Sequence, residues 1–356
     1  MSNNVQEILG KYGLEFHVEA FGNGHINDTY VSEDGKYILQ RINTNIFKNP
    51  DELMENILNV TEFLKKKITE QGGDPDRETL TVIKTTEGKL FHQTEDGSVY
   101  RVYKFIQNTR TIESNGSAED LYHAGGGFGH FQKMLSDFPV ETLHETIRDF
   151  HNTPKRIEAL KAAIANDKAG RASSVQKEIE FVLKYEKEAN IVVDGIEDGS
   201  ISLCVTHNDT KINNILFEKD STEIVCVIDL DTVMPGSRLY DVGDALRVGG
   251  STAAEDEADL EKVWFNQKAF EAFVKGYLSE VGDVLTKREL ELLPFAVRLI
   301  TYEQGVRFLT DYLDGDTYYK IHREHHNLDR ARNQFKLVAD LMEKENQMKA
   351  FVSSLL

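Results

Sequence analysis

The sequence predicts an α+β protein of two lobes, a small β-rich N-lobe followed by a large, mainly helical C-lobe. Three observations support this prediction. The 356 residues are more than one hydrophobic core usually serves. Short apolar runs bounded by turn residues dominate the first part of the chain, and helical periodicity dominates the rest. We therefore expect the N-terminal lobe at residues 1–107 and the C-terminal lobe at residues 108–356.

The N-terminal part predicts five short strands and one helix. The strands show apolar runs punctuated by turn signals such as Asp34-Gly35. The helix from Pro50 to Lys67 has apolar residues at three- and four-residue spacing, with proline and acidic residues in its first turn, as expected of a helix start. The expected strands are Phe16–Phe21, Thr29–Ser32, Tyr37–Arg41, Leu80–Lys84 and Ser98–Ile106.

Helical patterning follows the last of these strands. The expected helices are Ala118–Leu135, Pro154–Ala165, Ser174–Glu188, Ala258–Leu278, Lys287–Leu309 and Leu328–Met348. The glycine tract at 125–129 looks like a phosphate-binding loop but lies inside the first of these helices, so we predict that it permits close contact between helices. Trp264, Phe265, Phe270 and Phe273 fall at helical spacing and are expected in the core.

The most informative segment interrupts the helices and contains three expected strands, Ile201–Val205, Ile215–Phe217 and Ile224–Ile228. Asp209 and Asn214 lie five residues apart (214 − 209), and Asp229 follows twenty residues after Asp209 (229 − 209). Phosphoryl transfer needs a carboxylate that orients a hydroxyl, and an amide and a carboxylate that hold the metal on ATP. Residues 207–209 alone would also suit a surface turn. The conjunction of strands, loop and second Asp favours an ATP-dependent kinase of bilobal, protein-kinase-like fold.

The N-terminal lobe offers candidates for binding the nucleotide. Gly22 and Gly24 lie between two expected strands, where glycine amides can approach phosphates, although the same residues would suit a hairpin turn. Phe105, Ile106 and Gln107 are expected to form a hinge whose main chain meets adenine. Kinases also place a cation on the third strand, and here Arg41 is the candidate in place of a lysine. No G-x(4)-G-K-[ST] motif is present, so a P-loop NTPase is not supported.

Composition limits the partners. The formal net charge of −19 (41 − 60) disfavours nucleic acid, and ATP binding then needs a metal ion and a locally positive pocket. No run of residues approaches the length of a membrane span, and the first residues lack the pattern of an export signal. Cys204 and Cys226 each lie in an apolar, strand-like run, which favours core packing over a disulfide or metal site. We expect no membrane partner and a cytoplasmic location.

Taken together, several segments resemble the aminoglycoside phosphotransferase-like superfamily, which includes choline kinase-like and homoserine kinase-like proteins, and within it the N-acetylhexosamine 1-kinases. The resemblance spans nearly the whole chain, and the long segments that contain Asp209 and Asp229 are its most specific part. The segments are Gly-Asn-Gly-His-Ile-Asn (22–27), Tyr-Ile-Leu-Gln (37–40), Arg-Val-Tyr-Lys-Phe-Ile (101–106), Val-Thr-His-Asn-Asp-Thr-Lys-Ile-Asn-Asn-Ile-Leu (205–216), Val-Ile-Asp-Leu-Asp-Thr-Val-Met-Pro-Gly-Ser (227–237) and Arg-Phe-Leu-Thr-Asp-Tyr-Leu-Asp-Gly-Asp-Thr-Tyr (307–318).

The resemblance implies transfer of the ATP γ-phosphate to the anomeric hydroxyl of N-acetylglucosamine or N-acetylgalactosamine, with Mg²⁺ as the cofactor. Asp209 matches the catalytic base, and Asn214 and Asp229 match the magnesium ligands. His25, Arg307 and Tyr318 match positions expected to contact the sugar. Asp231 is an additional candidate in the sugar or metal region.

Two other functions stay open at this point. A kinase of the same superfamily could act on another small alcohol, such as another sugar, an aminoglycoside or choline. An aminoglycoside kinase would need a strongly acidic acceptor surface, and a hexosamine kinase would not. A nucleotide-binding regulator without catalysis is the second alternative, although the intact residues 209, 214 and 229 argue against it. The choice between the two sugar epimers and the oligomeric state do not follow from the sequence.

Overall fold

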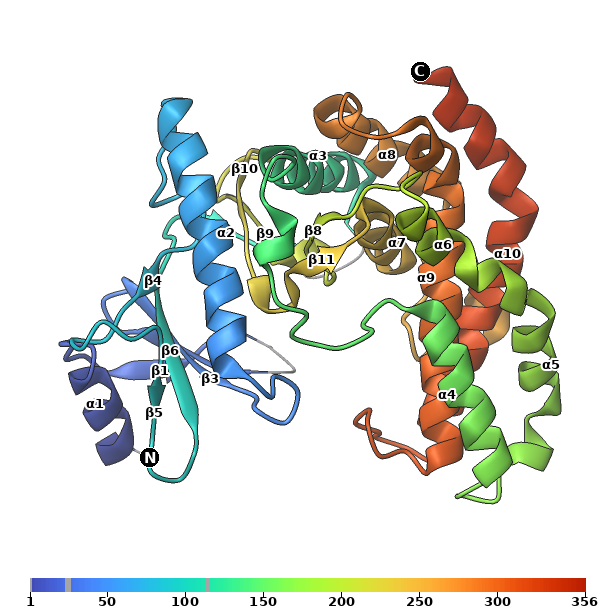
Figure 1. Cartoon of the computed structure of the whole chain (residues 1–356), viewed down its shortest axis with the longest axis horizontal. Helices are drawn as coiled ribbons and strands as arrows, with labels where there is room; N and C mark the ends of the chain where they lie inside the picture. The colour runs from blue at the N-terminus through green and yellow to red at the C-terminus, as the bar shows by residue number, and fades with distance from the viewer. Residues whose placement is uncertain (1, 23–26, 113–115) are drawn as a thin grey trace. The chain divides into compact units, whose positions relative to one another are not determined.

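The computed structural model of the chain describes residues 2–22, 27–112 and 116–356, with side chains from residue 5, and it divides into two compact units (Figure 1). Unit 1 comprises Met1–Thr111, Met134–Arg148 and Asn214–Pro235, and unit 2 comprises Ile112–Lys133, Asp149–Asn213 and Gly236–Leu356. The predicted α+β class is confirmed, with a β-sheet N-terminal region and a helical C-terminal region. The boundary between residues 107 and 108 stays a prediction, because each unit combines segments that are distant in sequence.

Unit 1 contains a six-stranded antiparallel sheet with the order β1-β2-β3-β6-β4, in which β5 also pairs with β6. A second sheet has the order β10-β9-β7. All five predicted N-terminal strands are present, with shifted ends. The elements of this unit are α1 (Ser2–Gly10), β1 (Val18–Ala20), β2 (Asp28–Ser32), β3 (Tyr37–Ile42), α2 (Pro50–Glu70), β4 (Val82–Ile83), β5 (His92–Gln93), β6 (Val99–Lys104), β7 (Thr109–Arg110), β9 (Ile215–Glu218) and β10 (Ile224–Val227).

Helix α2 forms where proline and capping chemistry predict it. Asn49 caps the helix, because its side-chain oxygen accepts a hydrogen bond from the Glu52 amide. The buried face of α2 includes Leu53 and Met54, and the Met54 sulfur lies 3.8 Å from a guanidinium nitrogen of Arg101 on β6. This contact places α2 on the face of the sheet that carries the Arg101 side chain.

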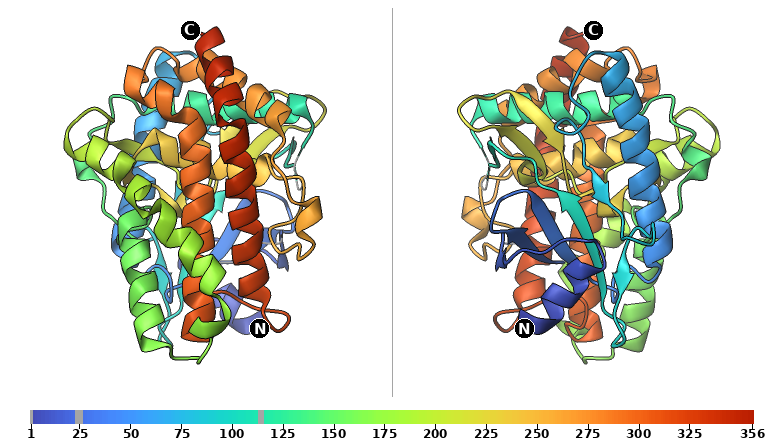
Figure 2. Two further views of the ribbon diagram at one scale, coloured as in Figure 1. Left: turned by 90° about the vertical axis from the view of Figure 1, so that its right-hand side faces the viewer. Right: turned by 90° about the vertical axis from the view of Figure 1, so that its left-hand side faces the viewer.

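Unit 2 is mainly helical. The long helices α9 and α10 run side by side, and α4 packs against α9 (Figures 1 and 2). The six predicted helices are present, but α7 and the short α6 were not predicted. The helices and the strand of this unit are α3 (Ala118–Met134), α4 (Thr153–Asn166), α5 (Gln176–Tyr185), α6 (Ile191–Glu197), β8 (Cys204–Thr206), α7 (Arg238–Gly249), α8 (Gln267–Val281), α9 (Lys287–Asp314) and α10 (His326–Ser354). The last residue of α3, Met134, is assigned to unit 1, and strand β11 (Met234–Gly236) has its first two residues in unit 1 and its last in unit 2.

The glycine tract in α3 packs against α8, as predicted. A Cβ atom on Gly125 would lie 2.1 Å from the Phe273 carbonyl oxygen, and one on Gly129 would lie 2.8 Å from the Tyr277 carbonyl oxygen. On α8, a Cβ atom on Gly276 would lie 1.9 Å from the carbonyl oxygen of Tyr122 on α3. The glycines therefore let two helix backbones approach closely, and they form part of a helix rather than a phosphate-binding loop.

The prediction for the aromatic cluster is correct except at Trp264. Phe265, Phe270 and Phe273 are buried, whereas Trp264 is 48% exposed and has the Lys344 ammonium 5.4 Å from its ring centroid. The predicted helix began too early, since α8 starts only after the cap at Asn266. Trp264 therefore lies before the helix, where helical periodicity does not decide which side chains are buried.

The two cysteines lie in the core, as predicted. Cys204 and Cys226 are buried and free, and burial raises the pKa of Cys204 to about 12.

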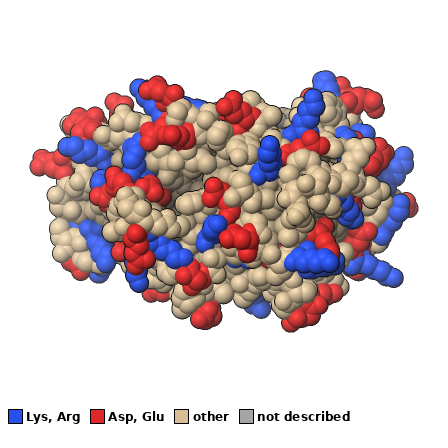
Figure 3. All heavy atoms as spheres, turned by 90° about the horizontal axis from the view of Figure 1, so that it is seen from above, with Lys and Arg blue, Asp and Glu red and all other residues tan. Residues whose placement is uncertain are grey.

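None of the described helices combines the length and apolarity that crossing a bilayer requires. Acidic and basic side chains interleave over the face shown in Figure 3, so the negative net charge does not gather into one patch there.

Candidate active site

The loop that carries Asp209 follows β8 in unit 2, and its backbone conformation is unusual. Asn208 has a φ of 64°, a left-handed value that asparagine tolerates better than most residues. The ring of His207 is buried against α3, with ring centroids 5.8 Å from Phe128 and 6.0 Å from Phe131. His207 Nδ1 accepts a hydrogen bond of 3.2 Å from the Asp209 amide. Packing on one side and hydrogen bonding on the other therefore fix this loop.

Helix α7 holds the same loop through two buried carboxylates. The carboxylate of Asp241 accepts hydrogen bonds from the amides of His207 and Asn208 at 3.0 and 2.7 Å. Asp244, one turn later, accepts the amide of Thr210 at 2.9 Å. Gln132 of α3 donates to Asp241 at 2.7 Å. Because charge-assisted bonds to backbone amides are strong and directional, they orient the loop around Asp209.

Asp209 is itself 20% exposed and forms an ion pair of 2.8 Å with the ammonium of Lys211. Burial alone raises the pKa of Asp209, but Lys211, followed by His207 and Arg247, lowers that pKa below its ordinary value. The carboxylate therefore stays ionised in neutral solution and accepts hydrogen bonds. This state suits a group that orients a hydroxyl and receives its proton.

Asn214 and Asp229 lie in unit 1, at facing ends of β9 and β10. The Ile228 amide donates a hydrogen bond of 2.9 Å to the Asn214 carbonyl oxygen, which brings residue 229 beside residue 214 along the backbone. Asp229 adopts a left-handed conformation with φ 60° and ψ 57°. Aspartate tolerates this conformation better than most residues, and residues held in it occur both in turns and at functional sites. An amide oxygen and a carboxylate are the hard donors that Mg²⁺ prefers, so this donor set fits that ion.

Asp231 has a different environment from Asp229. Its Oδ1 lies 2.6 Å from a guanidinium nitrogen of Arg101, and its Oδ2 accepts a hydrogen bond of 2.7 Å from Asn27. Both groups belong to unit 1, and the side chains of Arg101 and Asp231 are 1% and 5% exposed. These contacts place Asp231 to hold Arg101, and its assignment to the sugar or metal region stays a prediction.

The third-strand cation predicted at Arg41 faces solvent. The Arg41 side chain is 50% exposed and lies 3.6 Å from Asp28. Its neighbour Gln40 points to the other face of β3, as strand alternation requires, and its oxygen accepts two hydrogen bonds from Arg101 at 3.0 and 2.8 Å. A buried cation of this sheet is therefore Arg101 on β6, a residue that was not among the predicted nucleotide-binding residues.

The remaining nucleotide candidates are only partly described. Gly22 has a φ of 73° at the turn after β1, whereas Gly24 and His25 lie outside the described residues. In the predicted hinge, the Phe105 amide donates to the Lys36 carbonyl at 2.7 Å, and the Gln107 carbonyl accepts from Arg77 at 2.8 Å. Ile106 between them is buried. Contacts to adenine by residues 105–107 stay a prediction.

Arg307 and Tyr318 lie together in unit 2. The guanidinium of Arg307 lies 5.8 Å from the Tyr319 ring centroid, and the rings of Tyr318 and Tyr319 meet edge to face at 4.8 Å. Tyr318 is 62% exposed, and its amide donates to Asp311 at 2.8 Å. The field of Arg247 acts on the ionisation of both Arg307 and Asp209, so these two predicted site residues lie within electrostatic reach of one cation.

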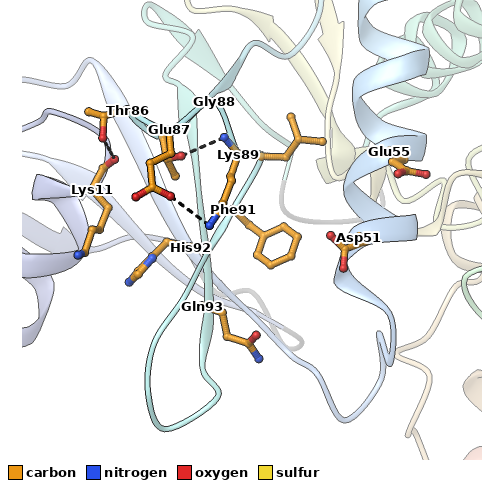
Figure 4. Close-up of a pocket in the computed structure, with 12 residues that line it drawn as sticks. Lys11, Asp51, Glu55, Thr86, Glu87, Gly88, Lys89, Phe91, His92 and Gln93 are labelled. Atoms are coloured by element: carbon orange, nitrogen blue, oxygen red, sulfur yellow. Dashed lines mark hydrogen bonds and ion pairs between the residues drawn. The ribbon is translucent and has the colours of Figure 1, made fainter.

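A cavity of 670 Å³ lies in unit 1 (Figure 4). It is bounded by the turn at residues 85–93 and by the acidic side chains of Asp51 and Glu55 on α2. Within it, Lys89 forms an ion pair of 3.1 Å with Glu87. None of the residues predicted for the active site is among those that line this cavity.

Comparison with known proteins defines the class. The fold is that of the kinase-like phosphotransferases. It matches a microcompartment-associated aminopropanol kinase (TM-score 0.64, 15% identity, 98% of this chain and 99% of that chain). It also matches an aminoglycoside phosphotransferase from Alicyclobacillus acidocaldarius (0.60, 14%, 98% and 95%) and a spectinomycin phosphotransferase in complex with ADP and spectinomycin (0.59, 16%, 98% and 99%). At these identities the likeness shows the fold alone. The chain belongs to the phosphotransferase enzyme family, whose model matches residues 17–273.

Three residues of this region were missed from the sequence. Asp241 and Asp244 lie three apart in the tract that follows Asp231, a spacing that puts both on one helix face. Arg101 alternates with Val99 and Tyr103 on a buried strand face, which is an unusual place for a charge. Both patterns were visible, but their partners lie in other segments of the chain.

Proposed function

We propose that this phosphotransferase is an ATP-dependent anomeric kinase that converts N-acetylglucosamine or N-acetylgalactosamine to the sugar 1-phosphate. Asp209 would orient and deprotonate the anomeric hydroxyl, and Asn214 and Asp229 would hold Mg²⁺ on ATP. The observation that carries the proposal is the carboxylate of Asp209, 2.8 Å from the Lys211 ammonium, on a loop whose backbone amides donate to Asp241 and Asp244. Phosphoryl transfer depends mainly on such positioning.

The residues assigned to Mg²⁺ support the same reaction. When bound, Mg²⁺ would supply charge neutralisation on the phosphates of ATP. An anomeric hydroxyl is more acidic than an ordinary alcohol, so Asp209 needs little basicity and acts largely through orientation. Its lowered pKa is compatible with that role.

The donors around Arg307 suit a neutral sugar. Arg156 lies near Arg307 and adds a second guanidinium to this part of unit 2, and the carboxylate of Glu303 acts on both. The hydroxyl and carbonyl oxygens of an N-acetylhexosamine can accept hydrogen bonds from such donors.

The product identifies the reaction. Purified protein is incubated with ATP, Mg²⁺ and each of the two sugar epimers, and the product is examined by phosphorus NMR. We expect a phosphate coupled to the anomeric proton of the sugar. Phosphate on another hydroxyl, or turnover only with an aminoglycoside or choline, would assign the chain to a different acceptor. Mg-dependent ATP binding without turnover on any acceptor would indicate a silent regulator.

The ion pair of Asp209 and Lys211 predicts the pH dependence of the reaction. In the wild type the pKa of Asp209 is lowered, so kcat/KM should fall only when the pH drops below the ordinary aspartate range. In Lys211→Met, the ammonium that lowers the pKa of Asp209 is gone, whereas the burial that raises this pKa remains. The pKa should therefore rise, and the acidic limb of the pH profile should move to higher pH. The matched control is Lys275→Met at an exposed position of α8, which should leave the limb in place. An unmoved limb in Lys211→Met would contradict this role.

A further inference from the structure

A hydrogen bond joins two segments of unit 1 that lie 204 residues apart in the sequence. The side-chain amide of Asn27 donates this bond, of 2.7 Å, to the carboxylate of Asp231. Asn27 directly precedes β2 and ends the glycine segment (residues 22–27), which is predicted to approach phosphates. Asp231 lies after β10, two residues past Asp229. The bond therefore connects the two parts of unit 1 to which the phosphates and Mg²⁺ are assigned.

A second contact orients the side chain of Asn27. The backbone amide of Asn43, directly after β3, donates a hydrogen bond of 2.9 Å to the side-chain oxygen of Asn27. The amide nitrogen of the same side chain, which can only donate, therefore faces Asp231. An aspartate at position 27 could still accept from Asn43, but it would place a second carboxylate against Asp231. The position thus requires an amide rather than an acid.

The network continues from Asp231 back to β2. The other carboxylate oxygen of Asp231 lies 2.6 Å from the buried guanidinium of Arg101, which also donates two hydrogen bonds to the oxygen of Gln40. The amide nitrogen of Gln40 donates in turn to the hydroxyl of Thr29 at 3.1 Å. Because Thr29 and Asn27 lie at the start of β2, the contacts form a closed ring through β2, β3, β6 and the turn after β10. A ring of this kind holds each member in one place.

Asp229 and Asp231 belong to one short turn. Leu230–Thr232 form a single turn of 3-10 helix with Asp229 at its N-cap, and the Val233 amide closes it with a bond of 3.2 Å to the Leu230 carbonyl oxygen. Two residues within one helical turn have little freedom to move separately. Contacts that fix Asp231 therefore also fix the backbone of Asp229.

We propose that Asn27 is a positioning residue that couples the glycine segment to the turn of Asp229, so that the phosphates of the nucleotide and Mg²⁺ bind as one unit. This inference rests on the proposed function, which assigns Mg²⁺ to Asn214 and Asp229. Asn27 acts through Asp231 rather than by contact with the metal ion. Residues that hold metal ligands in place in this way change metal affinity or activity by about 10–100-fold when they are replaced.

The experiment measures the Kd of ADP by calorimetry, once with Mg²⁺ and once with EDTA in its place. Asn27→Ala removes the donor, Asn27→Asp opposes two carboxylates, and the double variant Asn27→Asp/Asp231→Asn exchanges donor and acceptor. With Mg²⁺ we expect the Kd to rise about tenfold in both single variants. It should return most of the way to the wild-type value in the exchange variant, which keeps one carboxylate near Arg101. With EDTA, all four proteins should bind ADP alike.

Asn43→Ala is the matched control, because it removes a neighbouring asparagine side chain but keeps the main-chain bond to Asn27. The Asn43 side-chain oxygen accepts a hydrogen bond of 3.0 Å from the Asn45 amide, outside the ring of contacts. The Kd of ADP should therefore stay near the wild-type value. In steady-state assays the KM for ATP should rise in Asn27→Ala, whereas the KM for the acceptor should not, a split that a general loss of folded protein would not produce.

Two results would overturn the inference. One is a folded Asn27→Ala protein that binds ADP with Mg²⁺ as tightly as the wild type, and the other is an exchange variant that binds no better than the single variants. If Asn27→Asp does not fold, Asn27→Ala and the exchange variant decide the question. Either negative result leaves the proposed function standing. A wild-type protein whose affinity for ADP is independent of Mg²⁺ would instead remove the metal assignment on which the proposed function depends.

Discussion

Asp209→Asn should lower kcat for N-acetylhexosamine phosphorylation by about a thousandfold, within the range of about 10²–10⁴ that a positioned general base contributes. Asparagine retains the shape of the side chain but neither takes the hydroxyl proton nor pairs with Lys211. The side chain of Lys211 is 43% exposed, so water can solvate its ammonium when its partner is lost. The fold and the affinity for ATP should therefore change little. Release of ADP reports the rate, and thermal unfolding and calorimetry report the fold and ATP binding.

The matched control is Asp220→Asn in the exposed turn between β9 and β10. It removes the same charge from the chain and should leave kcat near the wild-type value. Near wild-type turnover by purified Asp209→Asn would show that another group serves as the base. A large loss of stability in Asp209→Asn would show instead that Asp209 mainly supports the loop.

The elements with regular periodicity were predictable from the sequence, and α7 shows where periodicity fails. Helix α2 has one apolar face, so its spacing is visible along the chain. Helix α7 is buried on nearly all sides and carries Asp241, Asp244 and Arg247 inside. Asp241 and Asp244 accept hydrogen bonds from the backbone of the loop before β9, and Arg247 pairs with Asp244. A pattern of that kind has no apolar stripe, and only the tertiary structure reveals its partners.

The candidate site likewise has residues that the sequence predicts and contacts that only the tertiary structure reveals. Asp209, Asn214 and Asp229 could be predicted because their local spacing is visible in the sequence, and their roles stay predictions. The sequence could not show which arginine lies on the buried face of the sheet. Arg101 pairs with Gln40 and Arg41 pairs with Tyr100, and only this register of β3 and β6 determines which guanidinium is buried. The role of Asp231 depended on the same register, since Arg101 is its partner.

Replacing that inner cation should cause the largest loss of stability. In Arg101→Met, the buried carboxylate of Asp231 loses its ion pair, and breaking a buried pair in this way costs about 3–5 kcal/mol. Burial lowers the pKa of Arg101, but Asp231, together with Tyr103 and Asp229, outweighs that effect and leaves the pKa raised. The free energy of unfolding from urea titration measures the loss. Arg41→Met on the exposed face should change that free energy by less than about 0.5 kcal/mol.

The double variant Arg101→Met/Asp231→Leu separates a structural role from a catalytic one. Removing both charges leaves no unpaired ion in the core, so much of the lost stability should return. The amide of Asn27, which donates to Asp231, would still lose its acceptor, and recovery should therefore be incomplete. If instead Arg101→Met keeps its stability but raises the KM for ATP, Arg101 serves the phosphates. In that case Asp231 would hold a nucleotide-binding cation in place rather than a purely structural one.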